Sequence, residues 1–187
     1  MRITHVVRQF HPAIGGLENY VSNLAREQAR AGHSVRVVTL DRLYAEPDRT
    51  LPRHETIGGV EIVRIPWRGS RRYPLAPGML AAIDGCDIVH VHAVDFFFDF
   101  AALTRLLHRR PMVVSTHGGF FHTGFASRLK QVYFRTVTRT TIGAYRAVLA
   151  SSVHDFGVFA AIRPTGMTLV ENGVDTAKFA DAGASTL

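Results

Sequence analysis

Cysteine, lysine and long apolar runs are scarce in this 187-residue sequence. The single cysteine, Cys86, excludes an internal disulfide framework and any metal site built from several cysteines, and it fits a reducing compartment. No apolar run approaches the ~20 residues of a membrane-spanning helix. The first residues, MRITHVVRQFHP, carry charges within their apolar stretch and have no cleavage site, so they do not resemble a signal peptide. We therefore expect a cytoplasmic protein.

The composition is that of a globular domain with excess positive charge. Hydrophobic residues make up 47% and charged residues 20%, which excludes general disorder, and the length suits one domain. The formal net charge is +7, and all but two of the 22 basic residues are arginine. This charge indicates an anionic partner: a nucleic acid, a phosphate-bearing substrate or an acidic membrane surface.

Apolar runs alternate with helical patterns along most of the chain. The expected strands are 3–7, 35–40, 60–65, 88–91, 112–115, 147–150 and 168–170, and the expected helices are 17–31, 94–108, 127–145 and 152–162. Segments 41–59 and 66–78 are expected to be a loop or hairpin and an exposed loop. This alternation predicts an α/β fold: a doubly wound, mostly parallel, Rossmann-like sheet with helices on both faces.

A glycine pair, Gly15-Gly16, lies between the first expected strand and helix. Ligands of doubly wound sheets bind at the carboxyl ends of strands, and a helix N-terminus there attracts anions. The surrounding residues match neither GxGxxG nor GxxxxGK[ST], which disfavours a nicotinamide or ATP site of the usual kinds. We expect a phosphate or sugar hydroxyl here, and a turn without ligand is the alternative.

The segment Thr116-His117-Gly118-Gly119 follows another expected strand and should face the same crevice. Histidine both donates and accepts hydrogen bonds, which suits contact with sugar hydroxyls. We predict that His117 contacts substrate and that His122 lies nearby. The alternative is a histidine that caps local backbone at the strand end.

His90 and His92 are two residues apart on an expected strand, so they point to the same side. No HExxH motif or cysteine pair supplies a third zinc ligand, so we expect structural histidines and no metal, with His92 nearer the crevice. Asp95 and Asp99 lie four residues apart at the start of a phenylalanine-rich helix. One is expected to stabilise the helix N-terminus and the other to contact substrate.

Two groups of arginines could face a membrane. Arg128, Arg135, Arg139 and Arg146 are spaced by 7, 4 and 7 residues, which places them within about 20° of one line on a regular helix. Phe125, Val132 and Ile142 flank that line. Arg68, Arg71 and Arg72 lie in the second loop, beside Trp67 and Tyr73. Such residues suit an anionic membrane interface, and a solvated helix face is the alternative.

These segments, taken in order, resemble family 4 retaining glycosyltransferases of the GT-B fold. The matching segments are Gly15-Gly16-Leu17-Glu18, Ala31-Gly32-His33-Ser34-Val35, Asp87-Ile88-Val89-His90-Val91-His92, Thr116-His117-Gly118 and Glu171-Asn172-Gly173-Val174-Asp175. The stretches HVVRQFHPAIGG, RGSRRYPLAP and VVSTHGGFFHTGFASRLKQ are similar to the α-1,3-mannosyltransferases of acetan- and xanthan-type exopolysaccharide assembly. Asn172-Gly173 alone is only a turn signal.

The resemblance implies a donor, an acceptor and roles for individual residues. GDP-mannose is the implied donor, and the implied acceptor is a cellobiosyl diphosphate polyprenol, met at the cytoplasmic face of the membrane. His117 would bond the transferred sugar as the catalytic residue. Donor or acceptor binding is expected from Gly15, Gly16, Glu18, His92, Asp95, Gly118, Gly119, His122 and Asn172. No metal or other cofactor is expected, because helix N-termini and basic groups take the metal's place.

In this family a C-terminal domain with a Glu-x7-Glu motif and a basic residue holds most of the donor nucleotide, and no such motif follows Leu187. We therefore expect residues 1–170 to form an N-terminal, acceptor-side domain that is inactive alone, with 171–187 as the start of an interdomain linker. The alternatives are a self-contained sugar-nucleotide-binding or epimerase-like domain, and a basic nucleic-acid-binding domain. No nucleic-acid motif accompanies the charge, so we expect no such partner.

Overall fold

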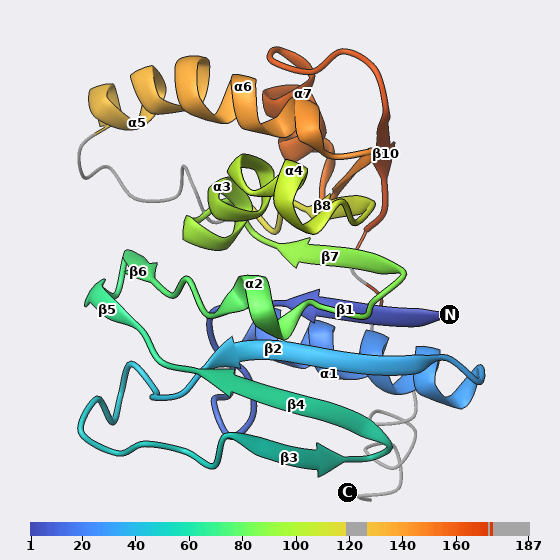
Figure 1. Ribbon diagram of the computed structural model, residues 1–187. Helices are drawn as coiled ribbons and strands as arrows, with labels where there is room; N and C mark the ends of the chain where they lie inside the picture. Colours follow the sequence, from blue (N-terminus) through green and yellow to red (C-terminus); the bar gives the residue numbers. More distant parts are fainter. Residues whose placement is uncertain (119–126, 172, 174–187) are drawn as a thin grey trace, which may run out of the picture.

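The computed structural model describes residues 1–118, 127–171 and 173, and its centre is an eight-stranded sheet (Figure 1). The strand order is β10-β9-β8-β7-β1-β2-β4-β3. The bounds are β1 Arg2–Val6, β2 Ser34–Leu40, β3 His54–Ile57, β4 Val60–Ile65, β7 Ile88–His92, β8 Met112–Ser115, β9 Ala147–Ala150 and β10 Met167–Leu169. The edge strand β3 is antiparallel to β4, and the other pairings are parallel. The predicted doubly wound α/β sheet is confirmed.

Helices cover both faces of this sheet (Figure 1). They are α1 Gly16–Arg30, α2 Met79–Ala82, α3 Phe96–Leu103, α4 Arg105–His108, α5 Ser127–Tyr133, α6 Arg139–Thr141 and α7 Val153–Ala160. Apolar side chains of β2 point to both faces of the sheet, so helices must pack on both faces. Val35 and Val37 pack in the apolar cluster under α1, whereas Val38 and Leu40 belong to the larger cluster on the other face.

Segment 41–59, expected to be a loop or hairpin, contains β3, which forms an antiparallel hairpin with β4. Three other local features differ from the sequence-based expectation. The loop 66–78 contains a small hairpin of β5 Arg68–Ser70 and β6 Tyr73–Leu75. The expected helix 94–108 is two helices separated at Thr104. The expected helix 127–145 includes a π-helical segment, η1 Phe134–Thr138, and a final 3-10 turn, η2 Ile142–Ala144.

Threonine hydroxyls in the π-helical segment and in the following α6 bond to backbone carbonyls. The hydroxyls of Thr136, Thr140 and Thr141 each donate to the carbonyl four residues earlier, at 2.6–2.9 Å. Such bonds compete with the regular backbone ladder, and β-branched side chains fit a regular helix less well. The helix therefore departs from 3.6 residues per turn at this point.

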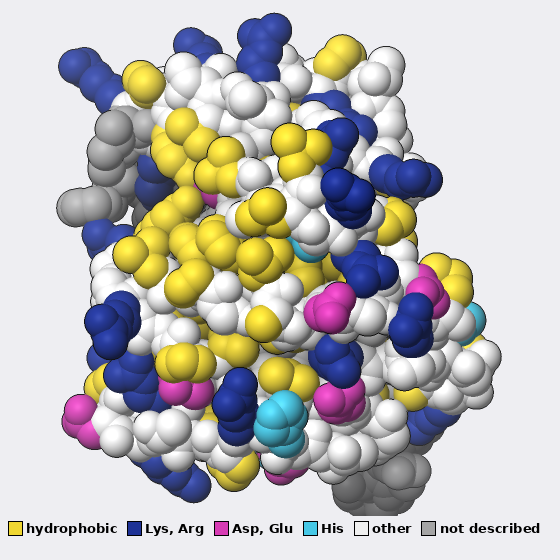
Figure 2. Space-filling model, in the orientation of Figure 1, with side chains coloured by type: hydrophobic (Ala, Val, Ile, Leu, Met, Phe, Trp, Pro, Cys, Tyr) yellow, Lys and Arg dark blue, Asp and Glu magenta, His cyan; other side chains and the backbone are white. Residues whose placement is uncertain are grey.

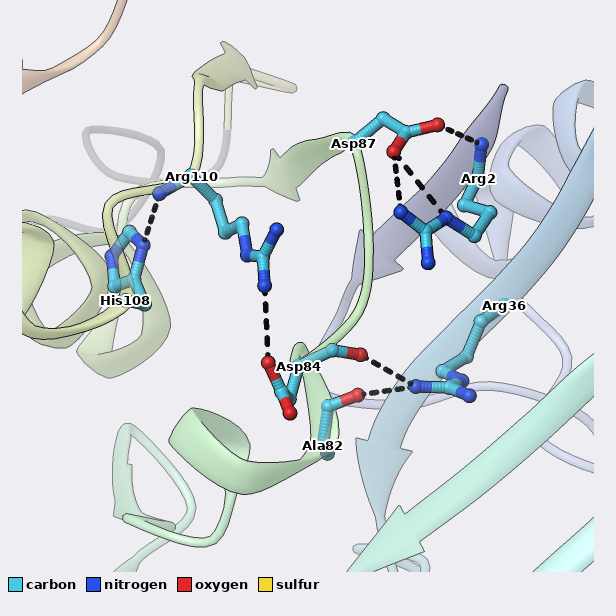
Figure 3. Close-up of polar contacts among 7 residues, drawn as sticks. All are labelled: Arg2, Arg36, Ala82, Asp84, Asp87, His108 and Arg110. Atoms are coloured by element: carbon cyan, nitrogen blue, oxygen red, sulfur yellow. Dashed lines mark hydrogen bonds and ion pairs between the residues drawn. The ribbon is translucent and has the colours of Figure 1, made fainter.

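Ion pairs and hydrogen bonds join the amino ends of the strands (Figure 3). The Arg2 guanidinium lies 2.9 Å from the Asp87 carboxylate, and Arg110 lies 3.1 Å from Asp84. Arg36 donates to the carbonyl of Ala82 at 2.9 Å. Two hollows, of about 510 and 160 Å³, lie at this amino edge. Ligands of doubly wound sheets bind at the opposite, carboxyl edge, so that edge is the place to look for a site.

Candidate active site

The carboxyl ends of β1, β7 and β8 lie side by side, because these three strands are consecutive neighbours in the sheet. His92 ends β7, and His117 follows β8 by two residues. The backbone turns sharply after both strands, with positive φ angles of 74° at Ala93 and 49° at His117. A non-glycine residue rarely adopts this conformation, which indicates that the surrounding contacts hold His117 in place.

Hydrogen bonds link three histidines and a glutamine across these elements. His117 Nε2 lies 3.1 Å from His92 Nδ1, and His92 Nε2 lies 2.9 Å from His5 Nδ1. His5 Nε2 lies 2.7 Å from Oε1 of Gln28 on α1. His5 and His90 are paired in register on β1 and β7, and His90 Nε2 bonds Ser115 Oγ at 2.8 Å. The four imidazoles therefore form one connected cluster at the face that α1 covers.

Burial keeps the four imidazoles neutral near pH 7. It lowers the pKa of His5 to about 4 and that of His117 to about 4, although Asp155 raises the latter. Burial, with the charges of neighbouring histidines, also holds the pKa values of His90 and His92 well below their usual range. A neutral imidazole has one N–H donor and one acceptor nitrogen, so the tautomer of one ring decides that of each ring hydrogen-bonded to it.

The nitrogens of His5, His90 and His92 lie close enough together to raise the question of a metal ion. Both nitrogens of His5 and both of His92 already have hydrogen-bond partners. His90 and His92 stack with ring centroids 4.1 Å apart and planes 29° apart, so their in-plane lone pairs do not converge on one point. The donor geometry therefore favours a hydrogen-bonded cluster over a metal site.

The glycine pair lies one helical turn from this cluster. Gly15 is the N-cap of α1, and the Tyr20 ring in the next turn packs edge-on against His117, with centroids 4.8 Å apart. A Cβ at Gly15 would lie 2.2 Å from Glu18 Oε2, so glycine here leaves room for that carboxylate. Tyr20 thus connects the first turns of α1 with His117, and an incoming anion at this helix terminus would meet Glu18.

Asp95 and Arg8 form an ion pair beside the cluster. The Asp95 carboxylate lies 2.8 Å from Arg8 Nε and accepts a hydrogen bond from the backbone of Phe97, which makes Asp95 the N-cap of α3. Its side chain is only 2% exposed, whereas that of Arg8 is 29% exposed. Asp95 therefore caps α3, and its burial argues against the donor or acceptor binding that was expected of it. Arg8 is better placed for direct substrate contact.

Asp99 lies inside the protein and is enclosed by hydroxyl groups. Tyr73 donates to its carboxylate at 2.9 Å, Thr141 donates at 3.1 Å, and the Tyr133 hydroxyl also donates. Burial raises the pKa of this carboxyl, and the three hydrogen bonds lower it. The expected substrate contact by the second aspartate is therefore not what the structure shows: Asp99 ties the β5–β6 hairpin to α5 and α6.

Known proteins resemble this chain along its whole length. A model of Glycosyltransferase Family 4 matches residues 14–178. The chain belongs to glycosyltransferase family 4. It is 53% identical to GDP-mannose:cellobiosyl-diphosphopolyprenol alpha-mannosyltransferase of Xanthomonas campestris, over 98% of this chain and 49% of that protein. Identity to the protein of the same name from Komagataeibacter xylinus is 44%, over 100% of this chain and 47% of that protein.

This family 4 chain spans about half the length of the curated relatives it matches. Its fold is similar to that of alpha,alpha-trehalose 6-phosphate synthase from Burkholderia multivorans, with a TM-score of 0.54 and 17% identity. That similarity covers 88% of this chain and 42% of the synthase, and it supports the GT-B fold class. Within the described residues, no helix is both long and apolar enough to span a membrane.

The seven arginines predicted to face a membrane are all exposed: Arg68, Arg71, Arg72, Arg128, Arg135, Arg139 and Arg146. The predicted single line of four is wrong, because the π-helical segment changes the helical register and the last helical turn ends at Ala144. Arg146 lies off the helix, where its backbone N–H bonds the Met112 carbonyl at the amino edge. Ile142, expected to flank the line, is buried, whereas Val132 is exposed.

Several predicted residues lie outside the described part of the family 4 chain: Gly119, His122, Phe125 and Asn172. Gly118 is described and has a positive φ of 64°, as a tight turn after His117 requires. Sequence reasoning missed His5, Arg8, Tyr20 and Gln28. One signal was available for His5, because two polar residues within an otherwise apolar first strand, Thr4 and His5, are unusual in a buried position.

Proposed function

We propose that this chain is the acceptor-binding half of a retaining mannosyltransferase. The complete enzyme would transfer mannose from GDP-mannose to a polyprenyl-diphosphate-linked cellobiosyl unit in exopolysaccharide synthesis. The names of the relatives at 53% and 44% identity support this donor and acceptor. The half of the relatives that this chain does not span would hold most of the donor nucleotide.

The observation that carries the proposal is the position of His117. It lies at the carboxyl edge, beside the N-terminal turn of α1, and no described residue bonds its Nδ1. His117 would orient a hydroxyl of the substrate, while Arg8 would face the diphosphate. In a front-side transfer the departing phosphate accepts the proton of the attacking hydroxyl, so no nucleophilic side chain is needed. Charge stabilisation would then supply much of the rate.

A chimera tests this proposal directly. The 187-residue chain replaces the matching N-terminal half of the Xanthomonas campestris relative, and mannose transfer from GDP-mannose to a cellobiosyl-diphospho-lipid is measured. We expect transfer by the chimera, none by the 187-residue chain alone, and little with GDP-glucose as donor. An inactive but folded chimera, or transfer by the chain alone at the rate of the complete relative, would contradict the proposal.

A lipid-linked acceptor would require the enzyme to work at the cytoplasmic face of the membrane, as a peripheral protein. Basic residues are available at the β5–β6 hairpin and on α5 and η1, which Asp99 holds together. Apolar side chains gather over α3 and α4, as Figure 2 shows. There Leu103, Leu106 and Leu107 are 71–79% exposed. Exposed leucines next to arginines suit an anionic bilayer surface, where each basic residue contributes about 1 kcal/mol.

Vesicle co-sedimentation tests the membrane part of the proposal. We expect the chain to sediment with anionic vesicles, weakly with neutral ones, and to be released by high salt. Replacing Arg128, Arg135 and Arg139 by Gln should weaken binding without changing the melting temperature. If the parent and the triple variant sediment equally, this helix face is solvated and does not contact the membrane. A matched triple variant at Arg68, Arg71 and Arg72 would then show whether the β5–β6 hairpin is the membrane contact.

A further inference from the structure

We propose that Gln28, through His5 and His92, sets which nitrogen of His117 carries its proton, and so presents His117 Nδ1 as a hydrogen-bond acceptor. This proposal adds detail to the transferase function proposed above. It rests on that function only for the identity of the group that binds His117 Nδ1. Gln28, His5 and His92 are positioning residues in this account, because His117 alone would touch substrate.

The direction of the hydrogen bonds that link Gln28 to His117 is set at Gln28. Its Oε1 atom lies 2.7 Å from His5 Nε2, and a carbonyl oxygen can only accept a hydrogen bond. His5 Nε2 must therefore carry the proton. Because this ring is fully buried and neutral, its Nδ1 carries none and can only accept. The amide of one half-buried glutamine thus fixes the tautomer of the first imidazole.

The same logic passes through the next two rings. His5 Nδ1 accepts at 2.9 Å, so His92 Nε2 carries a proton and His92 Nδ1 does not. His92 Nδ1 then accepts at 3.1 Å, so His117 Nε2 carries the proton. His117 Nδ1 is left with a lone pair and no partner among the described residues. Each ring is neutral, so no step of this chain requires an added proton.

The geometry around His117 keeps this arrangement in place. Its backbone is in the left-handed region, and the Tyr20 ring packs against one side of the imidazole. His92 is 1% exposed, which shields the hydrogen bond between His92 and His117 from water. A ring flip of His117 would place carbon where Nε2 now donates and leave the acceptor on His92 unpaired in the interior.

The chemical consequence concerns the ligand. An Nδ1 acceptor binds a hydroxyl that donates, and it repels a carbonyl, phosphate or ether oxygen in the same place. The site would therefore require a free hydroxyl at the position that meets His117. A deoxy or O-methyl substrate analogue at that position would leave Nδ1 unpaired.

Long-range imidazole ¹⁵N NMR of the labelled chain near pH 7.5 tests this proposal without substrate. The protonated and unprotonated nitrogens of a neutral ring give well-separated signals. We expect His5, His92 and His117 each to be the single Nε2–H tautomer. A His117 ring with the proton on Nδ1, or an equal mixture of tautomers, overturns the proposal whatever the fate of the transferase assay.

Two variants of Gln28 separate positioning from mere packing. Gln28→Glu keeps an oxygen acceptor and should preserve the His117 tautomer, whereas Gln28→Leu removes the acceptor and should move both His117 nitrogens toward averaged signals. Backbone amide spectra check that each variant folds. A folded Gln28→Leu variant with unchanged ¹⁵N signals of the His117 ring refutes the role of Gln28. If that variant does not fold, the spectra of the parent and of Gln28→Glu still decide the tautomer.

Discussion

Lowering the pH from 7.5 to 5 should sharply destabilise this fold, because four histidines are enclosed together. Burial lowers the pKa of His5 and His117 to about 4, and it also lowers those of His90 and His92. The same side chains titrate near 6.5 in an unfolded chain. Between these values the unfolded state binds more protons, so stability is complete above about pH 6.5 and is lost as the pH falls toward 4.

The size of the effect follows from proton linkage. Near pH 5, each such histidine contributes a slope of about 1.4 kcal/mol per pH unit. For the fully buried His5, the complete loss is on the order of 3 kcal/mol. Asp95 opposes this trend, because burial raises its pKa to about 6 and the folded state then gains a proton on acidification. That gain offsets about one histidine, and Asp99, whose pKa burial also raises, acts in the same direction. Four histidines outweigh two carboxyl groups, so the net slope stays positive.

Urea unfolding at pH 7.5, 6 and 5, followed by the fluorescence of the buried Trp67, measures this slope. We expect the midpoint to fall steadily across the series. His90→Asn should reduce the slope, whereas the matched variant His54→Asn, at an exposed position, should leave it unchanged. A midpoint that stays constant from pH 7.5 to 5 would refute the neutral, enclosed histidine cluster.

Two further predictions concern buried polar anchors. Arg64 is 1% exposed and donates to the carbonyls of Pro52 and His11 and to the Glu55 carboxylate. Arg64→Met should therefore lower the free energy of unfolding in urea by about 3 kcal/mol and loosen the loop before the glycine pair. A loss of stability below about 1 kcal/mol would mean that these acceptors find other partners. The buried Tyr145 hydroxyl donates to the Phe98 carbonyl at 2.7 Å. Tyr145→Phe should therefore lower the free energy of unfolding by about 1 kcal/mol. An unchanged midpoint of urea unfolding would show that water replaces the hydroxyl.

The sheet was predictable because most of its strands are largely apolar runs that alternate with helical patterns, as expected for strands covered on both faces. The edge strand β3 was expected only as part of a loop or hairpin, since HETI is short and half-exposed and pairs only with β4. The β5–β6 hairpin was missed for a related reason: the tertiary bond from Tyr73 to Asp99 helps to fix it. The π-helical segment depends on threonine-to-backbone bonds that a regular helical period ignores.

The site was predictable only in part. The placement of His117 and Gly15-Gly16 at one edge follows from the rule that parallel strands end together. The partners of His117 do not follow from that rule, because Gln28 and Tyr20 reach the cluster through the docking of α1 on the sheet. The enclosure of Asp99 by hydroxyl groups likewise depends on Tyr133 and Thr141, which lie more than 30 residues away.

The assignment of the active site to the edge that carries His117 is tested by the steady-state kinetics of the His117→Ala variant, made in the chimera with the Xanthomonas campestris C-terminal half. An oriented hydrogen bond of about 2 kcal/mol in the transition state corresponds to about 30-fold in kcat. We predict a loss of at least this size in mannose transfer by a variant that still folds, although its melting temperature falls because the buried His92 Nδ1 loses its donor. The control variant His33→Ala should transfer at the parental rate. A His117→Ala variant that transfers mannose at the parental rate would contradict the assignment of this edge as the active site.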